Sequence, residues 1–413
     1  MELFKNTNFP FLRYKWPFIG ASIVLSMAGL ISIVLHGGLR YGIDFKGGAQ
    51  MTVRFASPPP LDKIRSALSN KIKGDVSVQS FTGSNEVIIG TELEEEKQLN
   101  VNRQAMVDVL TSTFGQPESG KLDFNNAGQG QLAERLRDPL ARAGVPMSDQ
   151  QLQTLVSNVL SFRNTPPRSG LITDFNQLSS VPGVTPAILN TIKQETYLAP
   201  FNIRNVEMVG PRVGAELRNK AVLATLYALA GMLVYIAFRF EVIYGVGAVI
   251  ACFHDTIITI GLFSIFNKDI TMTVIAALLT LVGYSMNDTI VIFDRIRENL
   301  KFSRREPLET VMNRSINQTL SRTVMTSGLT FLTVVALLIW GGQVLHGFSF
   351  ALVCGIIVGT YSSVFVASPI VLAGHYFMEK RKRRAPATTG TTAPAPAVAR
   401  PERTGKTPTK VAK

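Results

Sequence analysis

The chain of 413 residues is 46% hydrophobic and only 17% charged, a balance that excludes an ordinary soluble protein of this size. A net charge of +13 would suit a nucleic-acid ligand, but the basic residues are concentrated beside long apolar runs. That arrangement indicates a membrane protein and no nucleic-acid partner.

Six apolar runs predict membrane spans, because each is close to the roughly 20 residues that a helix needs to cross a bilayer. The predicted spans are 16–35, 221–238, 242–266, 270–293, 323–345 and 348–377. The first run follows Lys5, Arg13 and Lys15 and so resembles a signal peptide, but it is long and no small-residue cleavage site accompanies it. We therefore expect it to be a span.

The basic residues predict the orientation of the spans. They lie in an N-terminal segment 1–15, in a loop 294–322 and in a tail 378–413 that we expect to be disordered. Placing all three inside leaves both termini cytoplasmic and segment 36–220 outside. The run Lys380–Arg384 also suits contact with anionic membrane lipids.

The outer segment begins and ends with strand patterns. Apolar and polar residues alternate over 51–55, a helical pattern follows over 61–72, and strands are predicted at 76–81, 86–90 and 202–209. The sequence Thr82-Gly-Ser-Asn85 is typical of a turn. A β-α-β-β pattern with a distant closing strand predicts a ferredoxin-like unit.

Between these strands, about 92–200 predicts a mostly helical insert, with helices at 99–114, 131–143 and 150–162. Its segment 178–189 resembles a helix-hairpin-helix turn, which we interpret as an ordinary packed corner because the segment lies outside. The expected fold is an α-helical polytopic membrane protein. It has six transmembrane helices plus an external α+β ferredoxin-like domain that carries the insert.

Nothing in the sequence supports enzymatic chemistry. Cys252 and Cys354 both lie in predicted spans, so no disulfide framework is expected. The chain shows no metal-ligand cluster, no phosphate-binding loop and no nucleophile elbow. We expect no enzyme activity, no cofactor and no metal, which leaves an ion gradient as the energy source.

Asp288 is the strongest candidate for function. It lies in the fourth predicted span, where a central aspartate costs about 2.5–3.5 kcal/mol on insertion. Such a residue persists where it faces a cavity, an ion path or a partner charge. We interpret Asp288, with its neighbour Asn287, as part of a proton path. The alternative is a hydrogen-bond anchor between helices.

Asp255 is a second candidate, near the centre of the third predicted span. A neutral imidazole such as that of His254 can relay protons beside a carboxylate, although neighbours on a helix point about 100° apart. A relay and a structural bond between helices are both open for Asp255. Arg322, at the start of the fifth span, is the natural counter-ion for a carboxylate; the alternative is an arginine that sets topology.

Three motifs resemble those of the SecF family, the auxiliary membrane subunits of bacterial Sec protein export, which are related to resistance-nodulation-division transporters. They are Tyr41-Gly-Ile-Asp-Phe-Lys-Gly-Gly48, Val209-Gly-Pro-Arg-Val-Gly-Ala-Glu-Leu217 and Gly283-Tyr-Ser-Met-Asn-Asp-Thr-Ile-Val-Ile-Phe-Asp-Arg-Ile-Arg-Glu-Asn299. The likeness covers about 1–90 and 202–378. The insert departs from the family pattern, so its role is not implied.

The resemblance implies residue roles. Asp288 and Arg322 match an intramembrane pair linked to proton flow. A span–domain joint is implied for Tyr41, Gly42, Asp44, Phe45, Gly47 and Gly48. Gly210, Pro211, Gly214 and Glu216 belong to the motif that precedes the second span.

The resemblance also implies partners and a location. It implies pairing with SecD in a twelve-span complex, the SecYEG channel, a preprotein substrate and protons as fuel. The location is then the bacterial inner (cytoplasmic) membrane. Two other functions are weighed against this one: a proton-coupled, half-size efflux transporter for lipids or small molecules, and a passive translocase scaffold.

Overall fold

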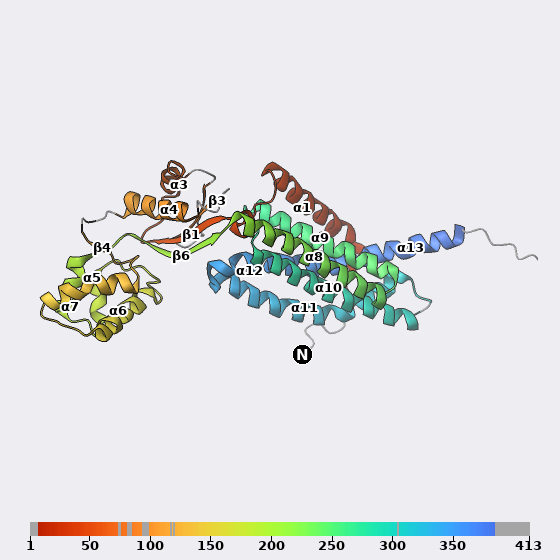
Figure 1. Ribbon diagram of the computed structural model, residues 1–413. Helices are drawn as coiled ribbons and strands as arrows, with labels where there is room; N and C mark the ends of the chain where they lie inside the picture. The colour runs from red at the N-terminus through yellow and green to blue at the C-terminus, as the bar shows by residue number, and fades with distance from the viewer. Residues whose placement is uncertain are drawn as a thin grey trace, which may run out of the picture.

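The computed structural model describes residues 7–72, 76–80, 85–92, 99–115, 118, 120–303 and 305–384. It has two parts (Figure 1). One is a bundle of long helices, and the other is a small sheet with an additional helical unit at one end of the bundle. The tail from Ala385 and most of the turn at 82–85 lie outside the described residues.

Six helical segments of the described chain are long and apolar enough to cross a membrane, which confirms the expected number. They are α1 (Lys15–Leu35) with a preceding 3-10 turn, α8 (Pro211–Arg239), α9 (Val242–Ile265), α10 (Met272–Phe302), α11 (Leu308–Trp340), and a composite of α12 (Gly342–Ser362), η4 (Ser363–Ala367) and α13 (Ser368–Arg384). In the composite, η4 is a π-helical stretch that joins α12 to α13 without a break.

Several helices run beyond the ranges expected from hydropathy. The predicted loop 294–322 is mostly helical, because α10 continues to Phe302 and α11 begins at Leu308. Likewise α8 begins at Pro211, inside the predicted outer segment, and α13 continues to Arg384, inside the predicted disordered tail. Charged residues end a hydropathy run but not a helix, because a helix continues in water when its residues allow it.

The sheet has the order β2-β3-β1-β6, formed by β1 (Gly48–Phe55), β2 (Val76–Ser80), β3 (Glu86–Glu92) and β6 (Phe201–Val209). All neighbouring pairs are antiparallel. The helices α3 (Leu61–Ser69) and α4 (Leu99–Phe114) share one apolar core with it, which includes Met51, Ile64 and Leu110. This β-α-β-β-α-β arrangement is the ferredoxin-like unit.

The insert is shorter than predicted, because α4 supplies the second helix of the ferredoxin-like unit and does not belong to the insert. The remaining insert holds β4 (Leu122–Asp123), α5 (Gln129–Arg142), α6 (Asp149–Asn164), η3 (Phe175–Ser180), α7 (Pro186–Glu195) and β5 (Thr196–Tyr197). These elements enclose a core of their own, and the predicted corner contributes Leu178, Val181 and Ile188 to it.

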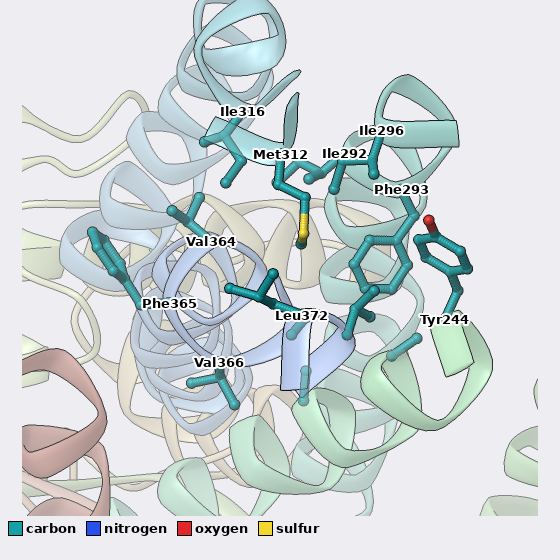
Figure 2. Packing of buried hydrophobic residues seen from close by; sticks show 14 of the residues in the cluster. Tyr244, Ile292, Phe293, Ile296, Met312, Ile316, Val364, Phe365, Val366 and Leu372 are labelled. Carbon is teal, nitrogen blue, oxygen red and sulfur yellow. The ribbon is translucent and has the colours of Figure 1, made fainter. Parts of the chain in front are cut away.

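A large apolar cluster holds the bundle together at the end remote from the sheet. Figure 2 shows Met312 of α11 beside Ile292 of α10, with Val364, Phe365 and Val366 of the π-helical stretch on the side of the cluster opposite Phe293. The rings of Tyr244 and Phe293 meet edge to face, 5.3 Å apart between centroids. Aromatic pairs favour this geometry, so α9 and α10 have a defined rotation about each other.

Glycines allow the closest helix contacts. Gly29 of α1 and Gly261 of α9 face each other so closely that a Cβ on either would lie 2.7 Å from the other's Cα. A Cβ on Gly355 of α12 would meet the Leu281 side chain, and one on Gly359 would lie 3.0 Å from the Cβ of Ser285. Small residues let spanning helices approach in this way, and the contact at Gly359 brings α12 against the most polar part of α10.

Candidate functional site: buried carboxylates and the joint to the sheet

Asp288 lies inside the bundle, with only 2% of the residue exposed. Helix α10 presents it to α11, where the Ser327 hydroxyl donates a hydrogen bond of 2.8 Å to its Oδ2. In the described part of the chain, no ion pair is formed by this carboxylate. Asp288 is therefore a carboxyl group that α10 and α11 hold between them through a neutral partner.

Arg322 and Asn287, the other residues expected beside Asp288, are both exposed. Arg322 is exposed and forms no ion pair among the described residues, but its positive charge still acts on Asp288 over a longer distance. It lies more than one helical turn from Ser327 on α11. Asn287 is exposed although its neighbours Met286 and Asp288 are buried, since consecutive residues on a helix point about 100° apart.

Asp255 is the second buried carboxylate, at 1% exposure. Its Oδ2 accepts hydrogen bonds from the hydroxyls of Ser285 on α10 (2.5 Å) and Ser362 at the end of α12 (2.8 Å). Ser362 directly precedes the π-helical stretch η4. The irregular backbone therefore begins next to the residue whose hydroxyl bonds Asp255. Asp255 thus joins three helices.

His254 does contact its neighbour, although adjacent helix positions point apart. Its Nδ1 lies 2.8 Å from Oδ1 of Asp255, while its Nε2 is buried with no hydrogen-bond partner among the described residues. The ring packs edge-on against Tyr361, whose hydroxyl lies 2.9 Å from Ser22 Oγ on α1. A string of polar groups therefore runs from α1 through α12 to Asp255.

The two glycine motifs meet at the start of α8. A Cβ on Gly47 would lie 2.6 Å from Cα of Pro211, and one on Gly214 would lie 2.9 Å from the backbone nitrogen of Gly47. Gly47 also has φ +80°, a left-handed conformation that favours glycine. The short helix α2 (Ile43–Lys46) consequently packs directly on the first turn of α8, whose N-cap is Gly210.

The same joint holds the start of α10. Asp44 Oδ2 accepts a 2.8 Å hydrogen bond from the backbone nitrogen of Met272, and the Gly42 nitrogen donates to the carbonyl of Ile270. Tyr41 forms an isolated bridge with Ile270, and its ring meets Phe45 edge to face. The residues of the joint therefore connect β1, α8 and α10, whereas Glu216 is exposed and pairs with Lys220 on its own helix.

Sequence reasoning missed the serines that partner the carboxylates. Ser327, Ser285 and Ser362 are each buried in a span, at 4%, 2% and 0% exposure. The sequence held a signal for them. Ser285 lies one turn before Asp288 and so shares its helix face, and polar groups buried in spans need hydrogen-bond partners. Within the described residues no cluster of His, Cys, Asp and Glu has the arrangement of a metal site.

These features define a multi-pass membrane protein in which a ferredoxin-like domain is fastened to a six-helix bundle with two buried carboxylates. The family described as protein export membrane protein SecD/SecF, C-terminal, matches residues 189–376, and the SecD/SecF GG motif matches 33–59. The chain is 49% identical to the protein translocase subunit SecF of Koribacter versatilis, over 90% of this chain and 93% of that one. It is 36% identical to SecF of Calditerrivibrio nitroreducens, over 93% and 99%. The chain belongs to the SecF family.

Solved structures of SecDF also resemble this chain in fold. The crystal structure of SecDF, a translocon-associated membrane protein from Thermus thermophilus, superposes with a TM-score of 0.59 at 30% identity. The matched region covers 90% of this chain but only 39% of the Thermus chain. SecDF in its super-membrane-facing form gives a TM-score of 0.51 at 29% identity, over 92% of this chain and 40% of that one. This chain therefore spans about two fifths of the length of the SecDF chains it matches.

Proposed function

We propose that this chain pairs with SecD in the bacterial cytoplasmic membrane as an auxiliary subunit of the Sec translocase. It uses the proton motive force to promote passage of preproteins through the SecYEG channel. The observation that carries this proposal is the environment of Asp288, a buried carboxyl whose described contact is the neutral hydroxyl of Ser327. The ferredoxin-like domain is then external, and the basic end of the bundle is cytoplasmic.

A proton at Asp288 changes the forces between α10 and α11. An ionised carboxylate that forms no ion pair is costly in a span, whereas a protonated carboxyl is neutral and also becomes a donor. Binding and release of the proton therefore favour different arrangements of these two helices. A potential of about 100 mV supplies roughly 2.3 kcal/mol for each charge that crosses it.

Helix α10 provides the route from this carboxyl to the external domain. Asp288 lies sixteen positions after Met272, a distance of about 24 Å at 1.5 Å per residue. The nitrogen of Met272 is bound by Asp44, and Asp44 lies four residues before β1. A shift of α10 along its axis thus acts on the joint that carries the sheet.

The test is export into proteoliposomes that contain SecYEG, SecD and this chain, with the proton gradient present or collapsed by a protonophore. In the Asp288→Asn variant, we expect export at the gradient-free rate under both conditions. Asp294→Asn is the matched control, since Asp294 lies on the same helix but is exposed and paired with Arg239. Gradient-stimulated export by Asp288→Asn would exclude the proton role and favour a passive scaffold.

A further inference from the structure

A cavity opens between α8, α9 and α10 directly below the joint. Its volume of about 710 Å³ is within the range of about 300–1,000 Å³ that is usual for small-molecule sites. Leu39, Phe45 and Ile270 line it near the sheet, and Leu229 and Val282 line its deeper part. Most of its wall is aliphatic or aromatic, so it is suited to a hydrocarbon chain.

The depth of the cavity corresponds to one leaflet of a bilayer. Along α8 the lining extends from Arg218 to Leu229, eleven positions that span about 16 Å. That is close to half of a hydrocarbon core about 30 Å thick. A spanning helix of a partner needs a groove along the whole bundle, whereas an acyl chain of one leaflet ends near the middle.

Arg218 supplies a positive charge at the mouth. It is exposed and lines the cavity, and among the described residues it has neither an ion pair nor a hydrogen bond. The neighbouring pair Glu216–Lys220 closes at 2.8 Å and lies on the opposite face, since two helix positions correspond to about 200° of rotation. The charge of Arg218 is thus available to an anion that the cavity holds.

The cavity is also open at its side, along the exposed face of α8. Val222, Leu223 and Leu226 line it and are 54%, 48% and 56% exposed. On a helix in a bilayer, exposed apolar residues face lipid. A lipid molecule therefore reaches the cavity by lateral movement, without passing through water.

We propose that this cavity binds one phospholipid of the leaflet nearer the sheet, with an acyl chain along α8 and the headgroup phosphate on Arg218. Arginine suits a phosphate because its guanidinium donates several hydrogen bonds in one plane. The bound lipid fills the space between α8 and α10 below the joint, so it supports the contact of Gly47 with Pro211. This site is separate from the carboxylates and does not depend on proton coupling.

Native mass spectrometry of the full chain in detergent tests the proposal, with 1-palmitoyl-2-oleoyl phosphatidylglycerol as the titrated probe. We expect one lipid to be retained by the wild-type chain, and Leu226→Trp to abolish this binding by filling the cavity. Arg218→Ala should weaken it at least about tenfold, and should not weaken binding of the matching diacylglycerol, which has no phosphate.

Two control variants separate the site from general effects on α8. Arg212→Ala removes an exposed arginine outside the cavity lining, and Leu233→Trp adds bulk at an exposed position outside it. Both should bind as the wild type does. Equal binding by Leu226→Trp and the wild type would overturn the proposal. So would failure of the wild-type chain, purified with SecD, to retain the lipid, because a partner would then occupy the cavity.

Discussion

The Ser327 hydroxyl on α11 donates a 2.8 Å hydrogen bond to Oδ2 of Asp288 on α10. We expect Ser327→Ala to lower gradient-driven export about tenfold or more, because a hydrogen bond to a charged group contributes roughly 1.5–3 kcal/mol. Ser327→Thr should retain the donor and most of the rate. The measurement is the export rate in proteoliposomes with and without a protonophore.

The control for this prediction is Thr326→Ala on the same helix. In the described part of the chain, the Thr326 hydroxyl donates to two carbonyls of its own helix, those of Arg322 and Thr323. Its loss should leave the gradient response unchanged. A similar loss in both variants would mean that α11 responds to any substitution there and that the bond to Asp288 has no special role.

Substitution of Gly214 should uncouple the external domain from the bundle. In Gly214→Ala, the added Cβ would lie 2.9 Å from the Gly47 nitrogen and 3.2 Å from the carbonyl carbon of Phe45, both backbone atoms that cannot rotate away. We expect assembly with SecD to persist while gradient-stimulated export falls severalfold. Gly231→Ala is the matched control on α8, since no described residue outside its own helix backbone lies within 4 Å of the added Cβ. Co-purification and export assays report the two outcomes separately.

Asp255 should act mainly as an anchor of α9, α10 and α12. Asp255→Asn keeps an acceptor for the Ser285 and Ser362 hydroxyls, so we expect a folded protein that still responds to the gradient. Asp255→Leu leaves both hydroxyls and His254 without their acceptor, and we expect it to unfold at lower temperature in detergent. A folded Asp255→Asn variant without any gradient response would instead assign Asp255 to the proton relay.

Arg163 should be essential to the fold of the insert. It is 7% exposed, and its Nη1 donates to the carbonyls of Phe124 and Ala127 at 2.7 and 3.0 Å. Arg163→Met leaves both acceptors buried, at a cost of about 1–3 kcal/mol for each. We expect faster amide hydrogen exchange throughout α5 and α6, with the exposed Arg142→Met as control. Unchanged exchange would show that water satisfies these carbonyls.

Asp123 should contribute more to the stability of the insert as the pH falls. Burial raises the pKa of Asp123 above its ordinary value of 3.8, against hydrogen bonds from Asn126 and Asn125 that lower it. A carboxyl with a raised pKa in the folded state stabilises the fold fully below 3.8 and loses this contribution as the pH rises through the raised value. Asp123→Asn should remove the dependence, measured as protease resistance of the insert in acidic and neutral buffer.

The sequence alone was enough to predict six spans, the strands of the outer domain and the presence of a charged residue, Asp288, inside an apolar helix. These properties are local. The length of an apolar run determines whether a helix crosses a bilayer, and alternation over a few residues determines a strand. The joint at 41–48 was implied by the resemblance of that motif to the SecF family. Its contacts with Pro211 and Met272 were not predicted, because those residues are distant in the chain.

Only the tertiary structure decided which groups meet. Ser327 lies 39 positions from Asp288, and the rotation of α11 that brings it there turns Arg322 outward. Packing likewise determined that α4 belongs to the ferredoxin-like unit, since its apolar face is buried in the core of that unit. Helical periodicity predicts that a face will be buried but does not identify what buries it. The contact partners depend on how helices distant in sequence rotate and shift against one another.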